Sequence, residues 1–446
     1  MAKHVVVMSV DAMVYEDLDI LKNCKNTSRL LQEGALIKHI HTIYPSLTHP
    51  VHATCITGCY PDKTGVYSNE HFQAGELNPP WYNSLSDIQV ETIFHAAKKA
   101  GLTTAACRWP VTANGDDVID YLVPEIMDAD LKDDLESVYI QLGSGRIMED
   151  IVRPNFSILQ KNDRPQYDAF EIKCAADIIK KYRPNLLFTH PGLVDHVRHE
   201  TGLFSDQVTE ALHLTDEWLG ILLDAIEEAG IAQDTDFIMM ADHGHLPVCR
   251  VLCPNVFLAD EGLIHVSSDG SLLDWDAYIK TSGLSGFVYL KDPSDPVFSA
   301  RVEAFLNKLA ADQIYGISEV LNGREAAEKY HLSGAFSFVI ESDGYTALCD
   351  DWRRPIVRNQ DPSDYRYGMS THGHMPEKGP QPIFLAMGPD FQKGMAIEKG
   401  EIINAAPTFA KVLGISLPDA CLLYTSTLHF LPKLIASLSH SSIFWV

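Results

Sequence analysis

Several carboxylates and imidazoles stand next to apolar runs that have the composition of buried β-strands. One carboxylate follows the run 5–10, an Asp and a His follow 185–189, an Asp-His pair follows 237–241, and a His-Gly-His segment precedes the run 382–387. These residues are Asp11, Asp195, His199, Asp242, His243, His372 and His374. Each residue type alone is common, so the prediction rests on their occurrence together at strand ends.

Ligands of open α/β sheets bind outside the carboxyl ends of the strands. A mixture of carboxylates and imidazoles at that edge suits zinc or a similar transition metal. The spacing of four between Asp195 and His199 places both side chains on one face if the segment forms a helical turn. The pattern therefore predicts a metal centre at one edge of a sheet.

A hydroxyl group suited to nucleophilic attack lies between the first two predicted strands, in the segment 44–61. Thr48 stands shortly before Pro50, which fits a first helical turn, so Thr48 is predicted to be the N-cap of a helix. The positive end of a helix dipole favours a phosphate group. A metal ion there would lower the pKa of the hydroxyl and make an alkoxide nucleophile.

Strand-like and helix-like segments alternate along the chain, which is typical of βαβ units around a mostly parallel sheet sandwiched by helices. The predicted strands are 4–10, 103–107, 185–189, 236–241 and 382–387. The predicted helices are 26–33, 88–100, 171–182, 205–228 and 405–412. Gly101, Gly230 and Gly414 follow three of these helices, as C-terminal caps do.

The regular alternation of strand-like and helix-like segments is interrupted between about residues 251 and 367. A strand at 287–291, a helix at 297–311 and a strand at 336–340 predict a smaller α+β insertion that covers the site. The predicted core is therefore 1–250 together with 368–420, and the inserted subdomain is 251–367. The tail 421–446 is atypical because it has no Asp or Glu.

Composition narrows the classes of function. With 35 basic and 60 acidic residues the formal charge is −25, which repels nucleic acid polymers and anionic membrane surfaces. The N-terminal apolar run is too short for a signal peptide, and no uninterrupted apolar stretch is long enough for a transmembrane helix. Nine scattered cysteines fit reduced thiols and a cytoplasmic location.

The order of these motifs resembles that of the alkaline phosphatase superfamily, and most strongly its nucleotide pyrophosphatase/phosphodiesterase (type I phosphodiesterase) family. The resemblance extends from about residue 3 to residue 418. The residues that carry it are Asp11, Pro45-x-x-Thr48, Gly58-x-Tyr60-Pro61, Gly65-Val66-Tyr67-x-Asn69, Asp195-x-x-x-His199, Asp242-His243-Gly244 and His372-Gly373.

The resemblance implies a two-metal site with two divalent ions, most simply zinc, with manganese or iron as alternatives. Its first ligand set is Asp11, Thr48, Asp242 and His243, and its second is Asp195, His199 and His372. Thr48 would attack phosphorus and form a covalent phosphothreonine, and Asn69 would donate to a phosphate oxygen. Three carboxylates and two divalent cations leave a net positive centre, which attracts a phosphate locally.

Some residues near the motifs stay open. His374 could replace His372 as a ligand, although the His-Gly pairing of the family favours His372. His245, His49, His52 and His196 are interpreted as supporting or structural residues, because ligands need orienting partners. Two segments depart from the family pattern, and one aromatic residue near the motifs is interpreted as part of the core. Ser46-Leu47 lacks the Lys that tends to precede the nucleophile, Asp195 lacks the usual Pro-Asp-Ser context, and Trp109 is interpreted as a core residue.

The predicted function is hydrolysis of phosphodiester or pyrophosphate bonds, with a small-molecule nucleotide as substrate. Alternatives from the same superfamily are a phosphonoacetate hydrolase, a phosphomonoesterase and a phosphomutase. The first would need substrate-gripping lysines, and the segment 108–120 has none. A module that binds nucleotides without hydrolysing them would require the loss of a ligand or nucleophile, and the sequence retains all of them. The oligomeric state stays open.

Overall fold

The computed structural model describes residues 2–126, 134–159 and 164–421. Its largest sheet has eight strands in the order β19-β2-β18-β6-β1-β5-β3-β4. All neighbouring pairs are parallel except those of β18, which runs antiparallel to β6 and β2. These strands are β1 (His4–Ser9), β2 (Ala35–His41), β3 (Thr104–Cys107), β4 (Tyr121–Val123), β5 (Leu186–Thr189), β6 (Thr235–Met240), β18 (Phe384–Met387) and β19 (Ala396–Glu401).

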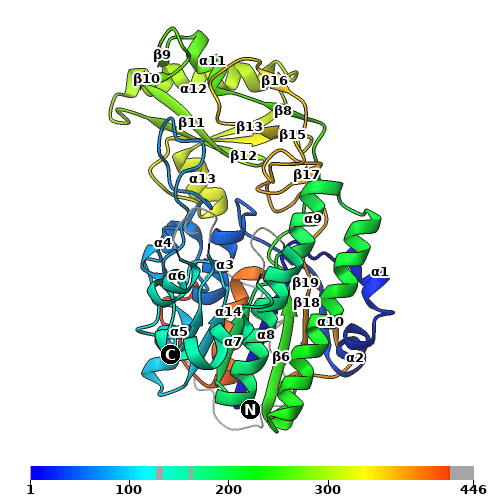
Figure 1. Cartoon of the computed structure of the whole chain (residues 1–446). Helices are drawn as coiled ribbons and strands as arrows, with labels where there is room; N and C mark the ends of the chain where they lie inside the picture. Colours follow the sequence, from blue (N-terminus) through cyan, green and yellow to red (C-terminus); the bar gives the residue numbers. More distant parts are fainter. Residues whose placement is uncertain (1, 127–133, 160–163, 422–446) are drawn as a thin grey trace, which may run out of the picture.

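Helices cover both faces of this sheet (Figure 1). Along β1 the side chains alternate between the faces: Val6 and Met8 belong to one buried cluster, and Val5 and Val7 to another. The first cluster packs against α8 (Arg164–Tyr182) and α10 (Asp206–Glu228). The second packs against α3 (Thr48–Thr57), α5 (Ile93–Lys99) and α14 (Ala405–Leu413). The predicted helix–sheet–helix fold is therefore confirmed.

The five predicted strands are present, and each boundary lies within two residues of its prediction. The prediction missed β2, β4 and β19. The helix predicted over 88–100 begins later, at Ile93, where Thr92 has extended backbone geometry and caps it. The helix predicted from residue 171 begins earlier, at Arg164.

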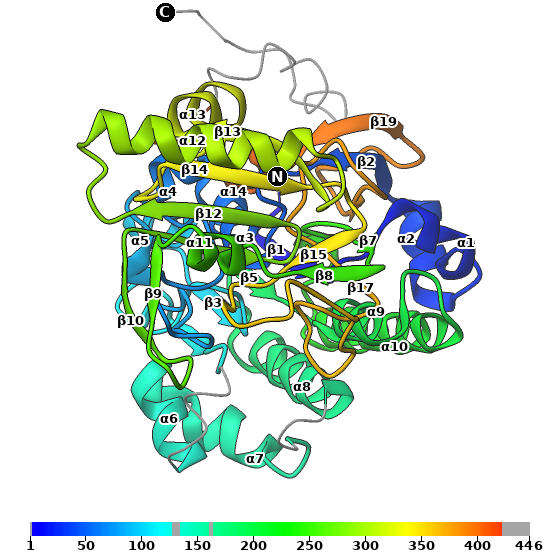
Figure 2. The same cartoon turned by 90° about the horizontal axis from the view of Figure 1, so that it is seen from above.

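A second, antiparallel sheet lies above the main sheet in Figure 1, and Figure 2 shows the molecule from that side. Its strands are β11 (Ala277–Ser282), β12 (Ser285–Leu290), β14 (Phe338–Ser342) and β13 (Ile317–Asn322). The helix α12 (Pro296–Ala311) packs on it through Val302 and Leu306, which share a buried cluster with Tyr278 and Val288. The elements predicted at 287–291, 297–311 and 336–340 all belong to this part of the chain.

Short elements complete the described chain. The strands are β7 (Leu246–Pro247), β8 (Arg250–Leu252), β9 (Ile264–Val266), β10 (Leu272–Trp275), β15 (Thr346–Leu348), β16 (Val357–Arg358) and β17 (Ser370–Thr371). The helices are α1 (Leu18–Leu21), α2 (Lys25–Glu33), α4 (Pro61–Thr64), α6 (Leu135–Leu142), α7 (Arg153–Asn155), α9 (Leu193–Thr201), α11 (Asn255–Asp260) and α13 (Gly323–Tyr330). Within the described ranges, no helix combines the length and the apolar character needed to cross a bilayer.

Candidate metal centre

The topology brings three of the predicted ligand segments together. The strands β6, β1 and β5 are neighbours in the main sheet and run parallel. Asp11 follows β1, the helix α9 follows β5, and the Asp242-His243 pair follows β6. Since the carboxyl ends of parallel strands meet at one edge, these side chains gather there.

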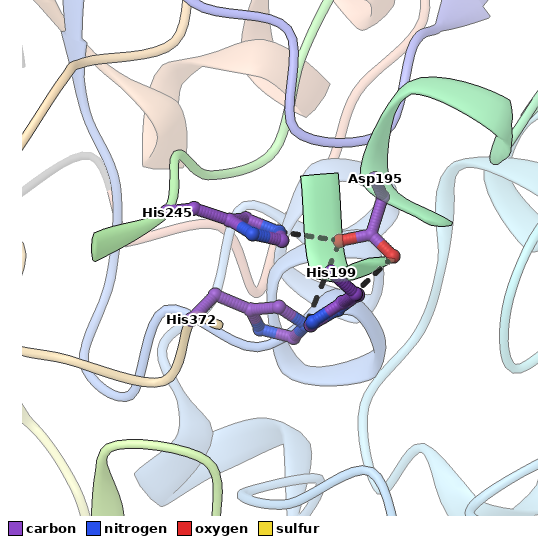
Figure 3. Close-up of side chains that lie close together, drawn as sticks. All are labelled: Asp195, His199, His245 and His372. Atoms are coloured by element: carbon purple, nitrogen blue, oxygen red, sulfur yellow. Dashed lines mark hydrogen bonds and ion pairs between the residues drawn. The ribbon is translucent and has the colours of Figure 1, made fainter. Parts of the chain in front are cut away.

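Four side chains converge in a first group, which we call the Asp195 group: Asp195, His199, His245 and His372 (Figure 3). The helix α9 places Asp195 and His199 one turn apart, as predicted, with Asp195 Oδ2 3.3 Å from His199 Nε2. Asp195 Oδ1 lies 2.7 Å from His245 Nε2 and 3.7 Å from His372 Nε2. One ligand atom from each residue lies within 4.8 Å of the others, which suits a single ion.

Hydrogen bonds fix two of these imidazoles with Nε2 toward Asp195. His199 Nδ1 lies 2.8 Å from the Ser370 carbonyl oxygen, and His372 Nδ1 lies 3.1 Å from the Ser46 carbonyl oxygen. Because a carbonyl oxygen only accepts, both Nδ1 atoms must carry the proton. Nε2 of each neutral ring then offers a lone pair, which is the usual arrangement of a metal-binding histidine.

A second group, the Asp11 group, consists of Asp11, Asp242 and His243. His243 Nε2 lies 3.2 Å from Asp242 Oδ2 and 3.6 Å from Asp11 Oδ1. The hydroxyl oxygen of Thr48 lies 3.2 Å from the same nitrogen. The two groups adjoin, because the rings of His243 and His372 stack with their centroids 3.9 Å apart.

The structure corrects the predicted role of Thr48 in its helix. Thr48 is the first residue of α3, and the N-cap is Leu47, whose backbone is extended (φ −116°, ψ 144°). The Thr48 backbone is already helical, so its hydroxyl does not cap the helix and lies against His243 instead. The backbone of Thr48 is held by His52, because the Thr48 carbonyl oxygen accepts a hydrogen bond of 2.7 Å from His52 Nδ1.

His52, His190 and Asp242 also lie close enough to resemble a metal-binding set. His52, however, uses both of its nitrogens: Nδ1 donates to Thr48, and Nε2 lies 3.0 Å from the Ser9 hydroxyl, which donates to it. His190 Nε2 lies 3.3 Å from Asp11 Oδ2. We therefore interpret His52 as a support for Thr48 and not as a ligand.

Burial and repulsion between neighbouring carboxylates shift the pKa values of residues in both groups. Burial, together with the nearby Asp195 and Asp242, raises the pKa of Asp11 well above its ordinary value. Burial also raises the pKa of Asp242 to about 7. Burial lowers the pKa of His243, and lowers that of His372 to about 4, which keeps both rings in the neutral form that binds metal.

Several polar atoms of the two groups lack a hydrogen bond in the described chain: Asp11 Oδ1, Asp242 Oδ2 and His199 Nε2. Buried polar atoms without partners are costly, and buried carboxylates that repel one another are more so. A divalent cation removes both penalties. The donor set of carboxylate oxygens and imidazole nitrogens therefore fits metal ions of the zinc type.

Asn69 lines a pocket next to His372 of the Asp195 group. Its Oδ1 accepts a hydrogen bond of 2.9 Å from the backbone N–H of His49, so its amide NH₂ is the end available to a ligand. Asn69 and His372 both line this pocket. Its other lining residues come from the entry to α3, the position after Asn69, the end of β11 with the turn that follows it, and the segment 365–371 that includes β17: Leu47, Glu70, Thr281, Ser282, Gly283, Tyr365, Arg366 and Thr371.

Three further histidines considered in the sequence analysis, and Trp109, lie outside both ligand groups. His374 is not in either group, and its Nε2 lies 3.1 Å from the carbonyl oxygen of Lys378. His49 pairs with Glu125 at 3.2 Å, and His196 lies 3.4 Å from Glu200. Trp109 is buried with its ring against Phe188, as expected of a core residue.

The sequence analysis gives His245 a supporting role, and the structure places this residue within the Asp195 group. The available signal was its place two residues after His243, with only Gly244 between them. Both imidazoles therefore leave the same short connection after β6 and reach the same centre.

Comparisons with known proteins agree with this architecture. Residues 5–338 match the family described as type I phosphodiesterase / nucleotide pyrophosphatase. Venom phosphodiesterase of Naja atra is 23% identical over 389 residues, which are 85% of this chain and 40% of that protein. Ectonucleotide pyrophosphatase/phosphodiesterase family member 3 of Rattus norvegicus is 25% identical over 403 residues, which are 87% of this chain and 39% of that protein. The chain thus spans about two fifths of the length of these relatives.

Solved structures share the fold. Murine ectonucleotide pyrophosphatase/phosphodiesterase 5 superposes with a TM-score of 0.67 at 18% identity, covering 93% of this chain and 96% of that one. A second murine structure, an inactive variant in complex with AMP, has the same TM-score at 17% identity and the same coverage of both chains. The family match covers most of the chain and includes both groups of candidate ligands except His372. The chain belongs to the type I phosphodiesterase / nucleotide pyrophosphatase family of hydrolases.

Proposed function

We propose that this protein hydrolyses phosphodiester or pyrophosphate bonds of nucleotides through a covalent intermediate on Thr48. The observation that carries the proposal is the position of the Thr48 hydroxyl, 3.2 Å from His243 Nε2 at the edge of the Asp11 group. A hydroxyl becomes a strong nucleophile when a neighbouring cation stabilises its alkoxide. The Asp195 group adjoins the same place through the stacked rings of His243 and His372.

Each group would hold one divalent ion. Asp11, Asp242 and His243, with Thr48, would hold the first ion, and Asp195, His199 and His372 would hold the second. Zinc suits these donors best, and manganese or iron are alternatives. When bound, such ions lower the pKa of the nucleophile and neutralise charge on the phosphoryl oxygens.

The chain's own residues then act in two displacements. Thr48 Oγ1 gives up its proton to water and attacks phosphorus, the bond between phosphorus and the leaving oxygen breaks, and that oxygen takes up a proton from water. A second water then gives up a proton and attacks phosphorus, the bond to Thr48 Oγ1 breaks, and Oγ1 takes up a proton again. The Asn69 amide would donate to a phosphoryl oxygen during both steps and stabilise the developing charge.

The lining of the pocket beside the centre includes an aromatic and a cationic side chain, Tyr365 and Arg366, together with His372 and Asn69. Nucleotides are the proposed class because of the family and because one related structure contains AMP.

Hydrolysis of bis-nitrophenyl phosphate, compared with nitrophenyl phosphate, tests the proposal on zinc-loaded protein. We expect a strong preference for the diester. The Thr48→Ala variant should lose at least about 1000-fold in kcat, while Thr48→Ser, which keeps a hydroxyl, should retain part of the activity. Thr209→Ala, on the half-buried face of α10, is the matched control and should match the unmodified protein.

Two results would refute the proposal. One is zinc-loaded protein that hydrolyses neither ester, in which case phosphonoacetate is the next substrate. The other is a Thr48→Ala variant that keeps full diesterase activity, since hydrolysis without a hydroxyl cannot pass through a phosphothreonine. Preference for the monoester would instead identify a phosphomonoesterase of the same superfamily.

A further inference from the structure

The Asp195 group contains one histidine more than the proposed function uses. His245 is fully buried and its Nε2 lies 2.7 Å from Asp195 Oδ1, which is the shortest of the three imidazole distances to that carboxylate. It arrives from the connection between β6 and β7, and its ring centroid lies 4.4 Å from that of His199, with the Asp195 carboxylate beside both rings (Figure 3). His245 therefore faces the same carboxylate as the two predicted histidine ligands.

The proton positions on His245 follow from its neighbour Ser370. The Ser370 hydroxyl lies 2.6 Å from the carbonyl oxygen of Arg198, and it must donate there because a carbonyl oxygen only accepts. A hydroxyl has one proton, so Ser370 Oγ can only accept from His245 Nδ1, which lies 3.0 Å away. His245 Nδ1 therefore carries a proton, and Nε2 is the ring nitrogen that faces Asp195.

With Nδ1 protonated, His245 directs Nε2 toward a carboxylate oxygen of Asp195 at 2.7 Å. A metal ion at this place would accept a lone pair from each of the two atoms. His199 and His372 have the same arrangement, with Nδ1 donating to a backbone oxygen and Nε2 directed to Asp195. Three imidazoles thus present the same atom to one carboxylate.

We propose that His245 is a fourth protein ligand of the ion in the Asp195 group, alongside Asp195, His199 and His372. This inference rests on the proposed function, because it concerns one of the two ions of that site. Four protein ligands complete a tetrahedral shell, whereas three leave a position open for water or substrate. The Asp195 group would then bind its ion more tightly than the Asp11 group binds the other ion. The ion of the Asp11 group, next to Thr48, would keep a coordination position open for the substrate.

The test measures metal binding to the full chain and needs no turnover. Cadmium-113 replaces zinc in both groups, so the loaded protein should give two resonances in its NMR spectrum. We expect His245→Gln to shift one resonance strongly and to leave the other near its original position. Competition with a chromophoric chelator should show zinc affinity at one site lowered by at least about 100-fold.

Glutamine separates a ligand from a positioning residue, because its amide can donate a hydrogen bond to Asp195 and hold it in place but offers no imidazole nitrogen to a metal ion. His265→Gln is the matched control, since His265 is exposed on β9 of the inserted part. If His245→Gln fails to fold, Ser370→Ala serves instead. It removes the acceptor of His245 Nδ1, and about a tenfold loss of affinity at one site is expected.

The inference is overturned if His245→Gln leaves both resonances and both zinc affinities unchanged, or if Ser370→Ala does so where it is the variant used. Its failure is distinguishable from failure of the proposed function. Protein that binds two ions and responds to the His245 substitution, but hydrolyses no diester, refutes the function and retains the ligand. Protein that binds neither cadmium nor zinc refutes both.

Discussion

Asn69 illustrates how one side chain is oriented by the backbone beside it. The His49 N–H donates to Asn69 Oδ1, so the NH₂ end is left for an incoming phosphate. In Asn69→Asp the carboxylate can still accept from His49, but a negative oxygen replaces the donor. We expect kcat/KM for the diester to fall by about 100-fold to 1000-fold, as for the loss of one oxyanion donor. Steady-state kinetics and the thermal midpoint would measure this effect.

The control for Asn69→Asp is Asn23→Asp, which adds the same charge at an exposed position after α1. It should retain the original kcat/KM. An equal loss in both variants would attribute the effect to net charge and contradict the role of Asn69 as a donor.

His372 and His374 form a natural pair for comparison. His372 Nε2 lies 3.7 Å from Asp195, whereas His374 Nε2 lies beside the Lys378 carbonyl oxygen. We expect His372→Gln to lose zinc affinity at one site by about 100-fold or more, and His374→Gln to retain both ions. Metal content after dialysis against a weak chelator shows which of the two histidines is the ligand. A loss confined to His374→Gln would reverse the assignment.

At the scale of elements, Glu341 links the second sheet to the main body. It lies on β14 and accepts hydrogen bonds from the Tyr44 hydroxyl at 3.0 Å, the Met375 N–H at 3.0 Å and Lys378 Nζ at 2.7 Å. Burial outweighs these contacts and raises the pKa of Glu341 from its ordinary 4.5 to about 7. The connection between the two sheets is therefore sensitive to pH.

The direction of this sensitivity follows from proton binding. Between pH 4.5 and about 7 the folded protein holds a proton on Glu341 that the unfolded chain has released, so this contribution to the free energy of unfolding falls as pH rises. Relative to Glu341→Gln, the unmodified protein should lose on the order of 2 kcal/mol across that window. Denaturant unfolding at a series of pH values measures it.

Glu328→Gln on the exposed surface of α13 is the control for Glu341→Gln and should keep the pH dependence of the unmodified protein. A Glu341→Gln variant whose stability changes with pH in parallel with the unmodified protein would contradict the raised pKa.

The whole molecule carries a formal charge of −25, and three of its carboxylates, on Asp11, Asp195 and Asp242, are concentrated in one buried centre. Bound cations should therefore contribute strongly to stability. We expect chelation to lower the thermal midpoint and added zinc to restore it. At a free ion concentration 100 times Kd, each site adds about 2.7 kcal/mol to the free energy of unfolding. Calorimetry with and without chelator measures the change.

Chelator saturated with zinc beforehand is the control for this experiment and should leave the midpoint unchanged. A midpoint that is equal with and without free chelator, for protein shown to have lost its ions, would mean that the centre contributes nothing to stability.

The central strands of the main sheet and the carboxylates at their ends are predictable from local sequence patterns. The strands β1, β5 and β6 are buried on both faces, so they appear as continuous apolar runs followed by polar ligand residues. Parallel neighbours end at one edge, which is why Asp11, α9 and the Asp242-His243 pair could be predicted to meet. By contrast, β2 contains half-buried polar residues and β19 contains exposed ones, so neither has such a run and the sequence pattern does not predict them.

The separation of His372 from His374 and the entry of His245 into the centre depend on long-range contacts. Gly373 adopts φ 92°, in the left-handed region, so His372 and His374 on its two sides do not follow a strand alternation that could be deduced from spacing. The orientation of His245 depends on Ser370, which lies 125 residues away in the sequence. Hydrogen bonds between distant segments set which ring nitrogen is bare, and a local pattern contains no information about them.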